Sequence, residues 1–164
     1  LPCIVDPKSI ALFEEFGVLS EPEVRSRYEV KLEKYNKLIN IEVRTMKRMV
    51  RRTYLPAINA FSSDLAAGIT SFKAVNASAN TRQQETLLDK LLDGIDEIDR
   101  ALEALSEAHA SSLEIADEQQ RATFNAHTII PLMEKLRAAL DAMEVITGRD
   151  RWPVPSYNNL LFYV

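Results

Sequence analysis

The sequence has few of the residues that build disulfides, metal sites and phosphate-binding loops. Its 164 residues include one cysteine, two histidines and four glycines. Cys3 cannot form an internal disulfide by itself, which favours a reducing compartment, and we take the cytoplasm as the expected location. The four glycines are isolated from one another, so the sequence offers no glycine-rich loop for a nucleotide.

Long apolar runs and excess positive charge are also absent. No run approaches the roughly 20 residues of a membrane-spanning helix, and no segment resembles a signal peptide. The formal net charge of −4 gives no general attraction to nucleic acid or anionic lipid. We therefore expect neither nucleic acid nor a membrane as a partner.

The apolar residues that are present follow helical spacing. One stripe advances in steps of three or four residues, which places its side chains on one face of a long α-helix. The stripe consists of Ile39, Val43, Met46, Val50, Tyr54, Ile58, Phe61, Leu65, Ile69 and Phe72. A helix with so long an apolar face needs other helices along its length, so the pattern predicts an all-α bundle.

Helix start and stop signals give the expected element boundaries. Asp6 followed by proline, and Gly17 as the C′ residue, bound a short helix over 7–16. A capping box from Ser20 to Glu23 begins a second helix, expected over 21–75. Because proline removes a backbone donor and clashes with the preceding turn, we expect a kink near Pro56, and a full break there is the alternative. Further helices are predicted over 80–113 and 117–147.

The C-terminal segment, 149–164, is rich in proline and aromatic residues. Its prolines exclude a regular helix and favour extended backbone, yet the segment is too apolar to be left loose. We expect a strap whose Trp152, Tyr157, Leu161 and Phe162 dock on the bundle or on a neighbouring domain. The predicted fold is an elongated antiparallel bundle of three long helices, with a short N-terminal helix and this strap, in a single domain spanning 1–164.

Two polar features invite a functional interpretation. Five basic residues on the second helix could bind a phosphate or an anionic partner. Alternatively, they could form exposed ion pairs with acidic positions over 89–103 of an antiparallel third helix. We favour the ion pairs. The five are Arg44, Lys47, Arg48, Arg51 and Arg52. His109 lies on the apolar stripe of the third helix. We favour a core or boundary position for it, because the Glu-x-x-His spacing of di-metal bundles is absent.

No catalytic, cofactor-binding or metal-binding residue is predicted. The serines have no nearby histidine with an orienting acid, and the carboxylates lie on solvated helix faces. The tyrosines of the stripe are expected to pack in the core, with their hydroxyl groups at its boundary. The residues expected in structural or interaction roles are Tyr28, Tyr35, Met46, Tyr54, Pro56, Pro131, Arg137, Trp152, Pro153, Tyr157 and Phe162.

The order of several short landmarks carries a family resemblance. They include Asp6-Pro7-Lys8-Ser9, Gly17-Val18-Leu19-Ser20, Arg27-Tyr28-Glu29, Ile39-Asn40-Ile41-Glu42, Leu55-Pro56-Ala57, Pro131-Leu132-Met133, Leu136-Arg137 and Trp152-Pro153-Val154-Pro155-Ser156-Tyr157. In this combination the chain resembles the C-terminal helical region of type III glutamine synthetases, the long-chain bacterial class. The resemblance is strongest over 4–57 and 131–162.

The resemblance implies a parent enzyme that joins ammonium to glutamate, using ATP through a γ-glutamyl phosphate with Mg²⁺ or Mn²⁺ at the phosphates. It also implies that the catalytic motifs lie upstream, so this segment would bind none of these groups. Its expected partners are the upstream catalytic domain and further copies in a homo-oligomer of stacked rings. The sequence begins with Leu1 and not with an initiator methionine, as we expect for a segment excised from a longer chain.

A second hypothesis remains open at this point. The chain could be an autonomous helical adaptor that binds a partner through its long helix or its basic cluster. A start codon directly before Leu1 would favour the adaptor, whereas an open reading frame that begins several hundred residues upstream would favour the synthetase segment.

Overall fold

A computed structural model describes residues 2–155 and 160–161 of the chain. In these residues all regular structure is helical, which confirms the predicted all-α class. The order is the 3-10 turn η1 (Pro2–Val5), α1 (Pro7–Glu15), α2 (Glu21–Met49), the π-helical turn η2 (Val50–Tyr54), α3 (Leu55–Val75), α4 (Arg82–Glu114), α5 (Glu118–Phe124), the π-helical turn η3 (Asn125–Ile129) and α6 (Ile130–Ile146).

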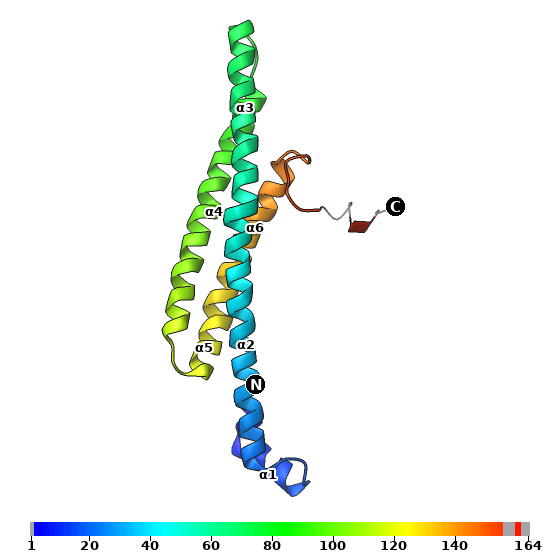
Figure 1. Cartoon of the computed structure of the whole chain (residues 1–164), viewed down its shortest axis with the longest axis vertical. Helices are drawn as coiled ribbons and strands as arrows, with labels where there is room; N and C mark the ends of the chain where they lie inside the picture. The colour runs from blue at the N-terminus through cyan, green and yellow to red at the C-terminus, as the bar shows by residue number, and fades with distance from the viewer. Residues whose placement is uncertain (1, 156–159, 162–164) are drawn as a thin grey trace.

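The molecule is elongated, and its axis is the rod formed by α2, η2 and α3 (Figure 1). The chain reverses at residues 76–81, so that α4 runs back beside α3 in the opposite direction. α4 packs on both α3 and α6, while α5 packs on α2. No helix in the described residues is long and apolar enough to cross a membrane.

Pro56 is accommodated by a wider helical turn. Directly before it, η2 forms a π-helical turn in which the backbone N–H of Leu55 donates to the carbonyl of Val50. Pro56 is then the second residue of α3, in the first turn after the π turn, a position at which proline is tolerated. The disturbance that the sequence predicts here is therefore a π turn, and α2 and α3 remain one rod (Figure 1).

The same arrangement recurs at Pro131. In η3 the N–H of Ile130 donates to the carbonyl of Asn125, and Pro131 is the second residue of α6. The helix predicted over 117–147 is thus α5, η3 and α6 in succession. Each proline follows a π turn, so both helices extend past a residue that would clash with an ordinary α-helical turn.

The core follows the predicted stripe along most of the rod. Val43, Val50 and Ile58 have no exposed surface, and they pack with residues of α4 and α6. Phe72, at the far end of the stripe, is 53% exposed and does not belong to the core. The reason is geometric, since the hairpin of α3 and α4 extends beyond α6, and no third helix in the part of the chain that the structure describes covers its end (Figure 1).

The helix ends follow the predicted signals in part. Gly17 has φ of 61°, the left-handed conformation expected of a C′ glycine. The Glu23 carboxylate accepts hydrogen bonds from the backbone N–H and the hydroxyl of Ser20 at 2.8 and 2.7 Å. Asp6 stands at the N-cap of α1, but its side chain makes no capping bond. α4 begins at Arg82 after Thr81, two residues later than predicted.

The segment after α6 returns to the bundle through Trp152. Its ring lies 5.3 Å from that of Tyr54, centroid to centroid, at 44°. Arg151 Nη2 pairs with Asp64 Oδ2 of α3 at 2.5 Å. Leu161 is 69% exposed, so the predicted docking on the bundle is found for Trp152 but not for Leu161. Tyr157 and Phe162 lie outside the described residues.

Candidate functional site

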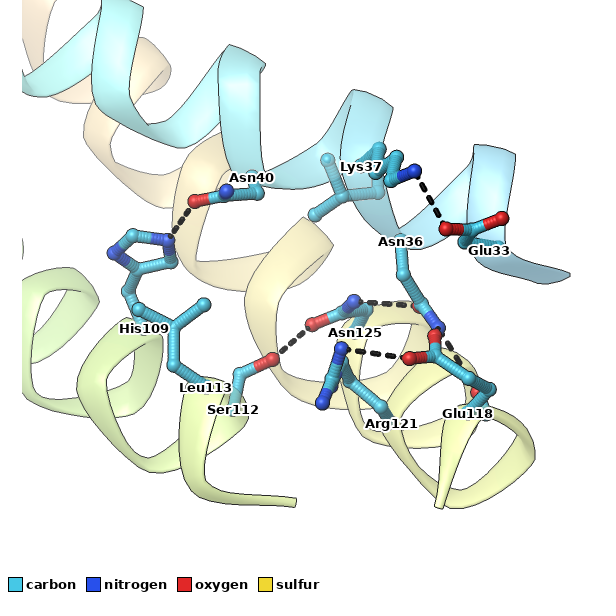
Figure 2. Close-up of a pocket in the computed structure, with 11 residues that line it drawn as sticks. Glu33, Asn36, Lys37, Asn40, His109, Ser112, Leu113, Glu118, Arg121 and Asn125 are labelled. Atoms are coloured by element: carbon cyan, nitrogen blue, oxygen red, sulfur yellow. Dashed lines mark hydrogen bonds and ion pairs between the residues drawn. The ribbon is translucent and has the colours of Figure 1, made fainter. Parts of the chain in front are cut away.

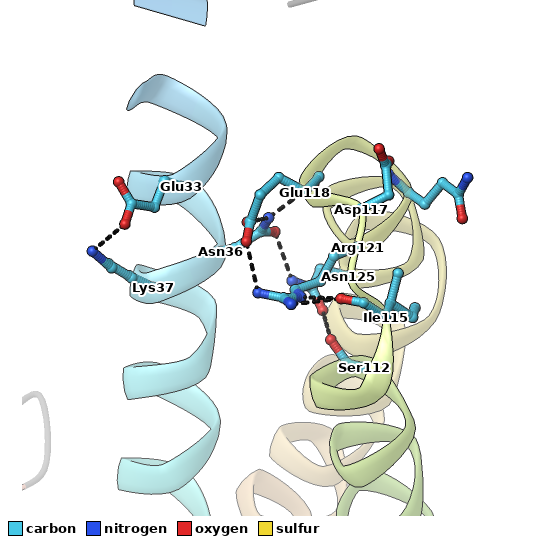
Figure 3. A network of polar contacts seen from close by, with 10 residues as sticks. Glu33, Asn36, Lys37, Ser112, Ile115, Asp117, Glu118, Arg121 and Asn125 are labelled. Atoms are coloured by element: carbon cyan, nitrogen blue, oxygen red, sulfur yellow. Dashed lines mark hydrogen bonds and ion pairs between the residues drawn. The ribbon is translucent and has the colours of Figure 1, made fainter. Parts of the chain in front are cut away.

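A line of buried polar side chains crosses the bundle where α2, α4 and η3 meet (Figure 3). Asn36, Ser112 and Asn125 are 4%, 3% and 3% exposed. The Ser112 hydroxyl donates to Asn125 Oδ1 at 2.6 Å, and the Asn125 amide donates to Asn36 Oδ1 at 3.0 Å. These bonds join Ser112 of α4 and Asn125 of η3, which are 13 residues apart, to Asn36 of α2, which is 89 residues from Asn125.

Asn36 connects this line to the start of α5. Its amide nitrogen donates to the backbone carbonyl of Glu118 at 2.9 Å and to Glu118 Oε2 at 2.7 Å. The other carboxylate oxygen of Glu118 accepts from Arg121 Nη1 at 2.9 Å. Arg121 also donates from Nε and Nη2 to the carbonyl of Ile115, at 2.9 and 2.5 Å. A carbonyl just past the end of α4, which has no intrahelical partner, is thereby satisfied.

The network positions helices and offers no arrangement for nucleophilic catalysis. Its buried amides and hydroxyl are bonded to one another, and the Ser112 hydroxyl donates to an amide and not to a base. A cavity of about 120 Å³ borders it, lined also by Glu33, Lys37 and Leu113 (Figure 2). A hydrogen-bonded polar network in a core favours one pairing and register of the helices that it joins.

His109 occupies the buried position that the sequence predicts, with 8% of its surface exposed. In the neutral ring Nε2–H donates to Asn40 Oδ1 at 2.8 Å, which ties α4 to α2 (Figure 2). Burial lowers the pKa of His109 from its ordinary value, and the positive charges of Lys47 and Arg44 lower it further. The ring is therefore uncharged at neutral pH.

The ion pairs in the described residues do not connect the basic cluster of Arg44 to Arg52 with the acidic positions of α4. Lys47 is half-buried, and its pKa is lowered by burial and by the charge of Arg51. The pairing favoured from the sequence is thus not found. Among residues 2–155 and 160–161, no group of three or more His, Cys, Asp or Glu side chains could hold a metal ion.

A groove lies on another side of the bundle, between α2 with η2 and α6. Its volume is about 540 Å³. The buried side chains of Val50 and Leu140 contribute to its lining, and Trp152 and Val154 line it from the C-terminal segment. The remaining lining residues are Ile41, Glu42, Thr45, Met46, Met49, Tyr54, Met133, Arg137, Asp141 and Glu144.

Four of the predicted interaction residues meet in this groove. They are Met46, Tyr54, Arg137 and Trp152. Burial raises the pKa of the Tyr54 hydroxyl, and the carboxylates of Glu144 and Asp141 raise it further while Arg137 opposes them. The groove is thus apolar inside and carries acidic groups at its edge.

The other predicted residues lie elsewhere. Tyr28 is 7% exposed and packs with Leu32 and with Ala122 of α5. Tyr35 is half-buried beside both apolar clusters of the molecule. Pro56 and Pro131 are exposed at the π turns, and Pro153 is exposed next to Trp152. Tyr157 and Phe162 are outside the described residues.

The polar network was not predicted from the sequence, although the spacing of its residues places them on the buried faces of their helices. Asn36 follows Leu32 by four residues, Ser112 follows His109 by three, and Asn125 precedes Ile129 by four. Each therefore shares a helix face with buried residues. Polar residues are usually exposed, and an apolar stripe that passes through His109 would continue four residues later to Leu113, yet Leu113 is 53% exposed and Ser112 is buried.

Comparison with known proteins gives consistent matches. Residues 1–73 match the family described as the glutamine synthetase C-terminal domain. The chain is 30% identical over 159 residues to the type-3 glutamine synthetase of Dictyostelium discoideum, an alignment that covers 94% of this chain and 22% of that protein. It is 28% identical over 162 residues to a glutamine synthetase of Butyrivibrio fibrisolvens, covering 99% of this chain and 23% of that protein.

A third relative is a glutamine synthetase of Bacteroides fragilis (strain YCH46), 22% identical over 161 residues. The chain spans only 22–23% of the length of these relatives, although the similarity extends over nearly all of its own length. The chain belongs to the family of glutamine synthetase C-terminal domains, and its homologues include a type-3 glutamine synthetase.

Proposed function

We propose that this chain is the non-catalytic C-terminal helical region of a type III glutamine synthetase, where it supports the catalytic part and contributes to subunit assembly. The parent enzyme would be a cytoplasmic glutamate–ammonia ligase that makes glutamine from glutamate, ammonium and ATP, with Mg²⁺ or Mn²⁺ at the phosphates. The observation that carries the proposal is the similarity to glutamine synthetases over 94–99% of the chain.

The use of the polar side chains supports a mechanical role. Asn36, Ser112 and Asn125 form hydrogen bonds with one another and with α5, which fixes how the helices are oriented. The described carboxylates and histidines also do not fit a metal ion, because no three of them converge. ATP and its metal would therefore be held by the remaining part of the parent enzyme.

The shape of the molecule supports the same role. The rod of α2, η2 and α3 is continuous from Glu21 to Val75, which is roughly 80 Å at 1.5 Å per residue. A rod of this length offers contact surface to more than one neighbour. The expected neighbours are the catalytic part of the same chain and other subunits of a homo-oligomer.

A comparison of glutamine formation by two proteins tests the proposal. The full-length protein should form glutamine from glutamate, ammonium and ATP, and the 164-residue chain should not. Binding of ATP, measured by calorimetry, should likewise be found only for the full-length protein. Turnover by the isolated chain would contradict the non-catalytic assignment, and an inactive full-length protein would contradict the parent activity.

The adaptor hypothesis is less well supported. An autonomous adaptor would have no reason to resemble glutamine synthetases along its whole length, from the first helix to the segment after α6. The length of the gene distinguishes the two hypotheses directly.

A further inference from the structure

We propose that the groove between α2 and α6, together with an exposed apolar stripe on α2, is the surface on which another part of the parent polypeptide docks, through a segment with apolar and basic side chains. This inference rests on the proposed function, because it takes the chain to be one part of a longer synthetase. It adds the surface and the chemistry of the segment that covers it.

The exposed stripe is the first observation. Val30, Leu38, Ile41 and Met49 are 60%, 47%, 58% and 37% exposed. With Lys34 and Thr45 between them, they advance in steps of three or four residues, so they share one face of α2. That face differs from the one formed by the buried residues of the core stripe. Within residues 2–155 and 160–161, this second apolar face of α2 is left exposed.

The groove continues the stripe. Ile41 and Met49 belong to both, and from there the apolar surface extends through Met46 and Tyr54 to Trp152. The whole surface runs over 20 residues of α2, from Val30 to Met49, or roughly 28 Å. A small molecule could fill the groove but would leave Val30 and Leu38 in water. The length of the surface therefore favours a polypeptide, and an amphipathic segment laid along a helical groove is a common mode of recognition.

The charge at the edge indicates the chemistry of that segment. Among the residues that line the groove, Glu42, Asp141 and Glu144 are acidic and Arg137 is the one base, while Lys34 lies farther along the stripe. Arg137 is paired with Asp141 at 3.5 Å, so Glu42 and Glu144 leave the edge negative. A segment with lysine or arginine beside its apolar residues would complement this edge.

The length of the relatives identifies the source of the segment. This chain spans 22–23% of them, so more than three quarters of each relative lies outside the aligned region. A segment on the same polypeptide is held at high effective concentration and does not have to be captured from solution. A second copy that used the same face would bring two acidic edges together, which disfavours a symmetric contact.

Site-specific photo-crosslinking in the full-length protein tests the inference. A photoreactive amino acid replaces Met49 in one variant and Val145 in the control variant. Val145 is 84% exposed on α6 and does not line the groove. We expect the probe at position 49 to crosslink within one chain, to a peptide that lies outside residues 1–164 and contains lysine or arginine. The control should give no such product.

A charge reversal tests the electrostatic part. Glu42→Lys should lower the yield of the crosslink at position 49 by about tenfold, because like charges then face each other. Crosslinks between two copies, or equal yields at positions 49 and 145, would overturn the inference. Glutamine formation is measured on the same preparations. An active enzyme without the crosslink refutes only the docking surface, whereas a well-folded but inactive full-length protein refutes the proposed function.

Discussion

Replacement of Asn36 by alanine removes the residue that joins α2 to α5 and η3. The side chain is 4% exposed and makes three hydrogen bonds, two of them to Glu118 and one from Asn125. Bonds between neutral groups contribute about 0.5–1.5 kcal/mol each, and bonds to charged groups about 1.5–3 kcal/mol. Glu118 is half-buried beside the cavity and can recover some hydration. We therefore expect the free energy of unfolding to fall by about 2–4 kcal/mol.

Urea unfolding of the 164-residue chain, followed by circular dichroism, measures this loss. The matched control is Lys37→Ala, the next residue of the same helix. The Lys37 side chain is 69% exposed and pairs with Glu33 on the helix surface at 2.5 Å. Loss of such a surface pair should cost less than about 0.5 kcal/mol. Equal losses in the two variants would refute the view that the buried network stabilises this junction.

A double-mutant cycle sharpens the test. Asn36→Ala and Asn125→Ala each leave the other amide without its partner, so the combined variant should lose less than the sum of the two single losses. We expect a coupling free energy of about 1–2 kcal/mol, since contacting residues in one network are not additive. Additive losses would show that the 3.0 Å bond between the two amides contributes little.

Further predictions concern packing and protonation. Gly68→Ala should stabilise the chain by about 0.5–1 kcal/mol, because nothing lies within 4 Å of the added methyl group. Gly94→Ala should instead destabilise it in the same urea assay, because its Cβ would lie 2.0 Å from the Sδ atom of buried Met143. His109→Gln should change the pH dependence of unfolding. The folded state disfavours protonated His109, so the unfolded state binds more protons. The contribution of His109 to the free energy of unfolding of the wild type is therefore fully present above the ordinary pKa of 6.5, and it is lost as the pH falls below that value. The variant should lack this fall. Trp152→Ala should cost about 1–3 kcal/mol in urea unfolding, through loss of the contact with the Tyr54 ring, and an unchanged midpoint would contradict the docking of Trp152.

Helical periodicity predicted the parts of the fold that repeat. Val43, Val50 and Ile58 are buried because residues three or four apart share a helix face, a rule that needs no knowledge of the partner helices. The rule failed for Phe72, since burial there depends on where α6 ends, and no local pattern on α3 contains that information.

The prolines and the polar residues were harder to interpret from the sequence. Pro56 predicts a disturbed helix, but a kink, a break and a π turn can each accommodate a residue without a backbone N–H, and the local sequence does not distinguish them. Asn36 and Asn125 are 89 residues apart, and their bond exists only after three helices have met. The sequence named Met46, Tyr54, Arg137 and Trp152 for structural or interaction roles but did not predict the groove, because its lining comes from two separate stretches, 41–54 and 133–154.

The central claim is that these helices support a catalytic centre located elsewhere in a longer synthetase. Sedimentation of the full-length protein, with and without residues 18–164, together with glutamine formation by the same samples, tests it most directly. We expect the shortened protein to form smaller assemblies and to lose most of its glutamine formation. Unchanged mass of the assembly and unchanged activity after the deletion would contradict the claim.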